Sequence, residues 1–424
     1  MQEALLQYVW RHALWEMTEF TADTGETIRI HHTGIHNTDA GPDFVQAKIE
    51  VDGMMWAGNV EIHVKASDWY THKHDSDPAY NNVILHAVAC NDSVCRNEAG
   101  RIVPTIVFTA PAALQEKYHS LVKSEDRIAC AAYVNKTDPS HIHFWLGALS
   151  LERLVCKAGQ VNRILQSTAN NWEESFYIQL LISFGSTINA LPFELLARSL
   201  PLKILRQQPE KRLHSEALLF GQAGFLESDP ADSYQAQLRD EYSYLRTKYR
   251  LKPIEKHLWK FLRSRPLNFP TIRLAQISSV LCRSRSLFSF ITEFQTVKDA
   301  VDFFSCNVNE YWKNHYTFGS KSAFSEKNLG RQTLYSILIN AVIPFMFLYG
   351  EHKNKSVYKG KAISWLEQIR PENNRIVRMW QNLGIHVCNA AESQALIQLT
   401  CHYCDNRKCL ECRFGYRILK HQHA

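Results

Sequence analysis

The sequence predicts an α+β protein built from three consecutive regions. Residues 1–125 contain short runs in which apolar and polar side chains alternate, which predicts a mixed α/β sheet domain. In residues 139–399 apolar side chains recur every three or four positions, which predicts a mostly α-helical, multi-helix domain. Residues 400–424 hold four closely spaced cysteines and predict a C-terminal metal-binding knuckle.

The composition indicates a soluble, globular chain, with 45% hydrophobic and 21% charged residues among 424. Its charge is unevenly distributed. Residues 1–120 contain 8 basic and 16 acidic side chains, and the rest of the chain contains 40 and 26. An acidic module followed by a basic one suits a metal-holding centre beside an anion-binding body. Two ordinary solvated surfaces explain these counts equally well.

No segment is predicted to enter a membrane or the secretory pathway. The N-terminal 17 residues carry charged side chains within their apolar stripe, unlike a secretory signal. The most apolar window, Leu334–Tyr349, is about 16 residues long and contains Asn340 and Pro344, so it predicts a buried helix. We therefore expect a cytoplasmic protein, in which the scattered cysteines are small core residues.

The sheet domain is expected to open with a helix over residues 2–17. Strands are predicted at residues 27–32, 44–51, 55–65, 83–90 and 101–108. Asp52-Gly53 is a strong two-residue hairpin turn signal between the second and third strands. The run 83–90 is nearly all apolar and predicts a central strand, whereas Pro104 makes the last strand an edge.

The helical region carries long amphipathic runs such as FWLGALSLERLVCKAGQVNRIL and TLYSILINAVIPFMFLYG. Breaks at Pro201, Gly221–Gly224, Pro266 and Pro270 divide it into a multi-helix array. One of its loops places Arg263, Arg265 and Arg273 among aromatic side chains. Such a loop could follow a nucleic-acid backbone, or it could lock two helices together.

The terminal segment CHYCDNRKCLEC has the spacing C-x2-C-x4-C-x2-C and offers Cys401, Cys404, Cys409 and Cys412 as ligands. Four thiolates form a closed site of the kind that holds structural Zn²⁺. An iron–sulfur cluster is the alternative occupant. Arg407 and Lys408, within the motif, would suit contact with phosphates of a nucleic acid.

The strand at 55–65 carries chemically capable side chains on one face. Its period of two places Glu61, His63 and Lys65 together, opposite an apolar face. Any half-exposed strand has this pattern. However, Pro42-Asp43 begins the preceding strand, and with Glu61-Ile62-His63 it resembles the motif of the PD-(D/E)XK, or restriction-endonuclease-like, nuclease superfamily.

The resemblance implies that Asp43 and Glu61 hold Mg²⁺ or Mn²⁺, with His63 in the position usually taken by lysine and Lys65 as a substitute. A two-residue turn would pair Asp43 with Ile62 and place Asp43 on the wrong face of the sheet. One extra loop residue would pair Asp43 with His63 and bring it to the face of Glu61.

The loop after this strand, SDWYTHKHDSDPAYNN, offers a second set of ligands. His72, His74 and Asp75 could bind zinc, manganese or iron, or they could belong to a solvated turn. His86, in the central strand, is expected to be a core histidine that could join the same pocket.

Several segments together resemble one bacterial family, described as domain of unknown function 2851. They are GPDF, VEIHVKASDWYTHKHDSDPAYNNVILHAV, SEALLFGQAGFL, RPLNFPTIRLAQ and the cysteine segment. The resemblance spans nearly the whole chain and implies that these modules belong together.

Three functions are compatible with these patterns. The first is a metal-dependent nuclease-like enzyme that cuts nucleic-acid phosphodiesters with Asp43, Glu61 and His63. The second is a catalytically inactive nucleic-acid-binding or scaffold protein with a structural zinc site. The third is a metal-dependent hydrolase that uses the His/Asp loop.

Overall fold

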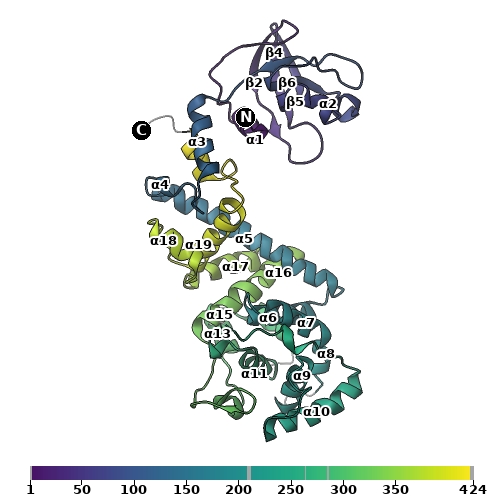
Figure 1. The fold of residues 1–424 in the computed structure, drawn as a ribbon, viewed down its shortest axis with the longest axis vertical. Helices are drawn as coiled ribbons and strands as arrows, with labels where there is room; N and C mark the ends of the chain where they lie inside the picture. The colour runs from purple at the N-terminus through teal and green to yellow at the C-terminus, as the bar shows by residue number, and fades with distance from the viewer. Residues whose placement is uncertain (1, 208–211, 263, 284–285, 421–424) are drawn as a thin grey trace. The chain divides into compact units, whose positions relative to one another are not determined.

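The computed structural model describes residues 2–207, 212–262, 264–283 and 286–420. The chain forms two compact units: unit 1 is residues 1–137 with 400–424, and unit 2 is residues 138–399. Unit 1 contains a mixed sheet and unit 2 is mostly helical (Figure 1), so the predicted α+β class is confirmed. The C-terminal segment, predicted as a region of its own, belongs to unit 1.

Unit 1 is built on a seven-stranded sheet in the order β1-β2-β4-β5-β6-β7, with β3 beside β4. The strands are β1 Phe20–Thr21, β2 Thr27–His32, β3 Ile35–His36, β4 Phe44–Val51, β5 Met54–Lys65, β6 Val83–Cys90 and β7 Thr105–Val107. The pairs from β1 to β5 are antiparallel, whereas β5-β6 and β6-β7 are parallel. The long strands have nearly the predicted bounds, because alternating burial is a local signal.

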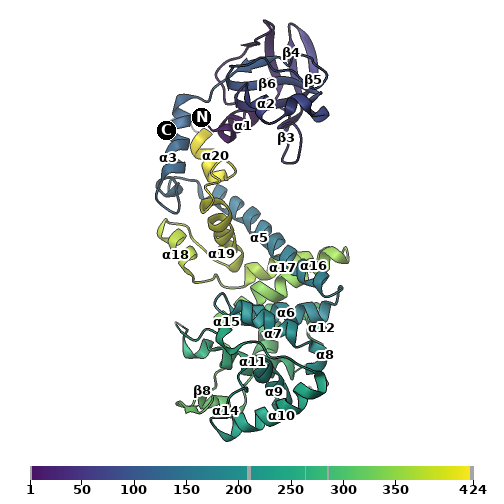
Figure 2. The same ribbon diagram turned by 45° about the vertical axis from the view of Figure 1, so that its right-hand side comes forward.

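The helical segments of unit 1 are α1 Glu3–Arg11, α2 Asp68–Thr71, η1 His74–Ser76, η2 Pro78–Tyr80, α3 Ala112–Lys123, α4 Ala131–Val134, the π-helix η6 Leu399–Cys404 at the unit boundary, and α20 Arg413–Lys420. Of these, α1 and α2 contact strand β5 of this sheet. The opening helix is shorter than predicted, since the chain turns at Ala13, whose φ is 49°. Figure 2 shows α20 beside α3.

The connection between the parallel strands β5 and β6 forms the site described below. Parallel neighbours need a long crossover, and here α2, η1 and η2 supply it. Trp69 and Tyr80 of this crossover are buried with Val88 of β6 in one small apolar cluster. The crossover is therefore held against one face of the sheet.

Unit 2 is a helical array with one short hairpin. Its elements are α5 Pro139–Ser167, α6 Trp172–Gly185, α7 Ala190–Ser199, α8 Leu202–Leu205, α9 Arg212–Gln222, α10 Ser233–Tyr249, η3 Lys256–Leu258, η4 Pro266–Asn268, α11 Pro270–Leu281, α12 Leu287–Glu293, α13 Val297–Phe304, α14 Glu310–Lys313, β8 His315–Thr317, β9 Ser320–Lys321, α15 Arg331–Ile337, η5 Leu338–Val342, α16 Ile343–His352, α17 Ser356–Gln368, α18 Arg375–Asn382 and α19 Ala390–Gln398. A continuous apolar core runs through it.

One helical run of unit 2, Arg331–His352, is long and apolar enough to cross a membrane. However, 72% of its most apolar window is buried inside the protein. It packs as a core helix, as the sequence predicts.

Candidate metal centre

Strand β5 presents the first two side chains of the site. Glu61 and His63 lie on the same face because side chains two residues apart in a strand point the same way. Both are buried, with exposed fractions of 5% and 1%. His86 of β6 is the register partner of Glu61, so it joins this face of the sheet.

A bulge in β4 brings Asp43 to the same place. The turn at Asp52-Gly53 has the two-residue form, with Val51 opposite Met54. Farther along, the register shifts by one residue, and Phe44 lies opposite Val60. The bulge includes Gln46, whose φ is 59°. Asp43 therefore reaches the face of Glu61 through a bulge within β4, and not through an extra residue in the turn.

Asp43 and Glu61 are held together by main-chain hydrogen bonds. The amide of Asp43 donates to Glu61 Oε2 at 2.9 Å, and the amide of Ile62 donates to Asp43 Oδ2 at 3.1 Å. Burial, and then the charge of Glu61, raise the pKa of Asp43 to about 7. Two buried carboxyl groups in contact destabilise each other's charge unless a cation lies near them.

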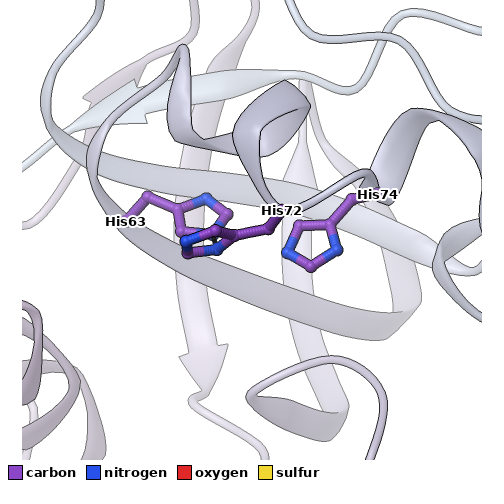
Figure 3. A group of neighbouring side chains, drawn as sticks. All are labelled: His63, His72 and His74. Atoms are coloured by element: carbon purple, nitrogen blue, oxygen red, sulfur yellow. Dashed lines mark hydrogen bonds between the residues drawn. The ribbon is translucent and has the colours of Figure 1, made fainter.

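The crossover delivers two more histidines. His72 ends α2 and His74 begins η1, and Lys73 between them adopts a left-handed conformation with φ of 63°. This local reversal turns both rings toward His63 (Figure 3). One nitrogen from each of the three rings lies within 4.8 Å of the others, which is close enough for all three to bind one ion.

Glu61 completes the arrangement. Its Oε1 lies 3.1 Å from His74 Nε2 and 3.6 Å from His63 Nε2, and His63 Nε2 lies 3.1 Å from His72 Nδ1. Although His74 Nε2 is close to Glu61, the angle is not that of a hydrogen bond, and this buried nitrogen has no hydrogen-bond partner among the described residues. Three imidazoles and a carboxylate thus face a common point.

A second layer orients these rings. His63 Nδ1 and His86 Nε2 are 2.8 Å apart, which leaves His63 Nε2 directed at the common point. Tyr80 stacks on His74 with ring centroids 3.8 Å apart, and Trp69 packs against His74 and His86. Burial, and then the neighbouring histidines, lower the pKa of His63 to about 3, so it stays neutral and able to bind a metal at neutral pH.

Helix α1 contributes two residues that the sequence analysis missed. Gln7 makes a side-chain hydrogen bond to Asp43. Glu3 is half-buried, and its pKa is raised by burial and by Glu61, while the charges of His72 and His74 oppose the shift. The available signal was their spacing of four, which places both side chains on one helix face.

Two predicted site residues lie outside the group. Lys65 is exposed, its amide donates to Asp68, and its charge acts on Asp92. Asp75 is partly exposed and does not belong to the three-histidine group.

The arginines predicted to contact nucleic acid differ in burial. Arg273 is buried and donates to Gln276 Oε1, Asn268 Oδ1 and Thr333 Oγ1. This bonding matches the alternative that the loop locks helices together. Arg265 is exposed, and Arg263 lies outside the described residues.

In the cysteine segment, Arg407 donates to the carbonyls of Ser124 and Asp126, and Lys408 lies 3.4 Å from Glu411. Arg407 is therefore used within unit 1. Cys401 is exposed, whereas Cys412 is buried.

Comparison with known proteins identifies the family but no activity. Residues 3–375 match the family described as "Protein of unknown function (DUF2851)", and the chain belongs to that family. No curated protein and no solved structure matches the chain significantly.

Proposed function

We propose that this member of the DUF2851 family is a metal-dependent, nuclease-like hydrolase of nucleic-acid phosphodiesters. The observation that carries the proposal is the convergence of His63, His72 and His74 beside Glu61. Asp43, in contact with Glu61, completes the site. The proposal joins two functions expected from the sequence, since the nuclease-like strands and the His/Asp loop meet at one place.

The donor set favours a transition metal. Mg²⁺ binds oxygen ligands and keeps several waters, whereas imidazole nitrogens suit Fe²⁺ and Zn²⁺, and the carboxylate of Glu61 also suits Mn²⁺. Of the two ions that the nuclease resemblance implies, the three histidines fit Mn²⁺ better than Mg²⁺. His63, His72, His74 and Glu61 would hold the ion, which would supply polarisation of the phosphodiester and a lowered pKa for a water molecule.

The remaining residues accept a proton from the attacking water and hold the ligands in position. Asp43, whose amide donates to Glu61 and whose carboxylate accepts from the amide of Ile62, is the group that accepts a proton from the attacking water. His86 fixes the ring of His63, and Gln7 holds Asp43. Lys65 takes no part.

The substrate class is supported by the resemblance of Pro42-Asp43 and Glu61-Ile62-His63 to the PD-(D/E)XK motif, and by the basic composition of the chain after residue 120. We place the activity in the cytoplasm of a bacterium. The alternative, an inactive nucleic-acid-binding scaffold, would keep the metal and the binding but lack cleavage.

The test is a cleavage assay on DNA and RNA, single- and double-stranded, with Mn²⁺, Zn²⁺, Fe²⁺ or Mg²⁺. We expect cleavage by the wild type with a transition metal, and its loss in Glu61→Gln and in the His72→Ala/His74→Ala double variant. His31→Ala is the matched control, because His31 is an exposed histidine of the same sheet.

Equal cleavage by all four proteins would identify a contaminant and reject the assignment. Metal binding and nucleic-acid binding without cleavage would establish the inactive alternative.

A further inference from the structure

Four cysteines line one narrow cavity in unit 1, and they are not the four of the terminal motif. The cavity, of about 20 Å³, is lined by Cys130, Cys404, Cys409 and Cys412 among other residues. Cys401, the first cysteine of the motif, is exposed and is not among the lining residues. Cys130 precedes α4, some 270 residues earlier in the chain.

We infer that Cys130, Cys404, Cys409 and Cys412 hold a single Zn²⁺ ion, which ties the α3–α4 segment to the C-terminal segment. Cys401 lies outside this ligand set. The inference does not depend on the proposed function, because it concerns a different part of unit 1.

Two arginine contacts fix the segment that carries Cys130 against the motif. Arg127 makes a two-pronged ion pair with Asp405, at 2.7 and 2.8 Å. In the opposite direction, Arg407 donates to the carbonyls of Ser124 and Asp126 at 2.6 and 2.8 Å. These contacts hold residues 124–127 beside the loop between Cys404 and Cys409, so Cys130 is brought to the motif by the fold.

The other side of the site is held by a close backbone approach. A Cβ atom added to Gly415 would lie 1.9 Å from the carbonyl oxygen of Cys409, so only glycine fits there. Tyr416 N–H donates to the carbonyl of Cys412 at 2.8 Å. Helix α20 therefore holds Cys409 and Cys412 in fixed relation to each other.

The thiols are close enough to interact electrostatically. The Cys404 thiol interacts with those of Cys130, Cys409 and Cys412, and the Cys130 thiol with those of Cys409 and Cys412. These four thiols also line the same cavity, whereas Cys401 is exposed and does not line it.

The cavity has room for a single ion. Its volume of about 20 Å³ holds about one water molecule. Four thiolates around Zn²⁺, at about 2.3 Å each, complete a tetrahedral site with no open position.

Only the three-histidine group, among the described residues, already brings three ligand atoms within 4.8 Å of one another. Zinc binding at the cysteines therefore requires the four sulfurs to move closer together.

The first experiment measures zinc, iron and acid-labile sulfide in purified full-length protein. All variants are made in the His72→Ala/His74→Ala background, so that the histidine site does not contribute zinc. We expect one zinc per chain in this background and in Cys401→Ser, and loss of that zinc in Cys130→Ser. Cys130→His, which replaces one zinc ligand by another, should retain it. Cys156→Ser, an exposed cysteine of unit 2, is the control.

Zinc retained in full by Cys130→Ser, zinc lost in Cys401→Ser, or iron with sulfide in place of zinc would overturn the inference. Because Cys130→Ser could also disturb folding, a second measurement uses the unmutated cysteines. Co²⁺-loaded protein should show thiolate-to-cobalt charge-transfer absorption. Alkylation should modify Cys401 with or without a chelator, and the four cavity cysteines only after chelation. Protection of Cys401 together with free reaction of Cys130 would contradict the ligand set.

Discussion

Two buried cations of unit 2 differ in their surroundings from the clustered ionisable groups of unit 1. In unit 2, Lys157 donates to Asn340 Oδ1 at 2.8 Å, and Arg273 reaches three side-chain oxygens. In unit 1, Asp43 and Glu61 face each other, and His74 Nε2 has no hydrogen-bond partner among the described residues. Lys157 and Arg273 complete the fold, whereas the carboxylates and histidines of unit 1 are gathered at one place, as in a site that binds a ligand.

The largest effect that this comparison predicts is in unit 2. Arg273→Ala removes a buried side chain that donates to three side-chain oxygens, one of them the buried Gln276 Oε1, so we expect the free energy of unfolding to fall by about 3 kcal/mol. Arg265→Ala, at an exposed position nearby, should change it by less than about 0.5 kcal/mol. Urea unfolding measures both. Equal stability of the two variants would show that Arg273 is not a structural group.

In unit 1, replacing a histidine of the site should lower the affinity for metal more than the free energy of unfolding. His74→Ala removes a ligand nitrogen, and we expect the affinity for Mn²⁺ or Zn²⁺ at this site to fall by at least about 100-fold. His86→Ala, which only orients His63, should cost about 10-fold. The affinities are measured by calorimetric titration with the metal. Each protein carries Cys130→Ser, so that zinc does not also bind at the cysteines. An unchanged affinity in His74→Ala would reject the site.

Removing a carboxylate should stabilise the metal-free protein. The pKa of Asp43 is about 7 in the fold and about 3.9 when unfolded, so the folded state binds the proton more tightly. This contribution to stability is present below about pH 4 and is lost as pH rises through 7. Asparagine carries no charge at any pH, so Asp43→Asn does not lose this stability as the pH rises. At pH 8 its free energy of unfolding should exceed that of the wild type by about 1–3 kcal/mol.

With saturating metal the wild type should be more stable than Asp43→Asn, because the ion stabilises the charged carboxylate of Asp43. Thermal unfolding at pH 5 and pH 8, with and without Mn²⁺, distinguishes the two states. A metal-free Asp43→Asn variant that is less stable at pH 8 would mean that the carboxylate is structurally satisfied.

The smallest effect is expected at Lys65. It is exposed and its charge acts on Asp92, so Lys65→Ala should change metal affinity and cleavage by less than about twofold. A loss comparable to that of Glu61→Gln would return Lys65 to the role that the nuclease resemblance implies.

The parts of the fold that the sequence predicted are those determined by local patterns. β2, β4 and β6 have the predicted bounds because the alternation or continuity of apolar side chains directly reflects burial. β7 lies at one end of the sheet, as Pro104 indicates.

The site was only partly predictable. Glu61 and His63 share a face by strand period alone. In contrast, the position of Asp43 depends on a bulge at Gln46, and that of His72 and His74 on a left-handed Lys73. Neither position is a glycine, so no sequence signal marks these reversals. Cys130 meets the terminal motif through contacts between distant segments, which spacing cannot reveal.

The most direct test of the central claim is zinc anomalous diffraction from crystals of the full-length protein soaked in Zn²⁺. We predict an anomalous peak about 2.1 Å from one nitrogen each of His63, His72 and His74, with Glu61 as a further ligand. The cysteine cavity serves as an internal reference for zinc uptake. A crystal with zinc at the cysteines and none at the histidines would contradict the account.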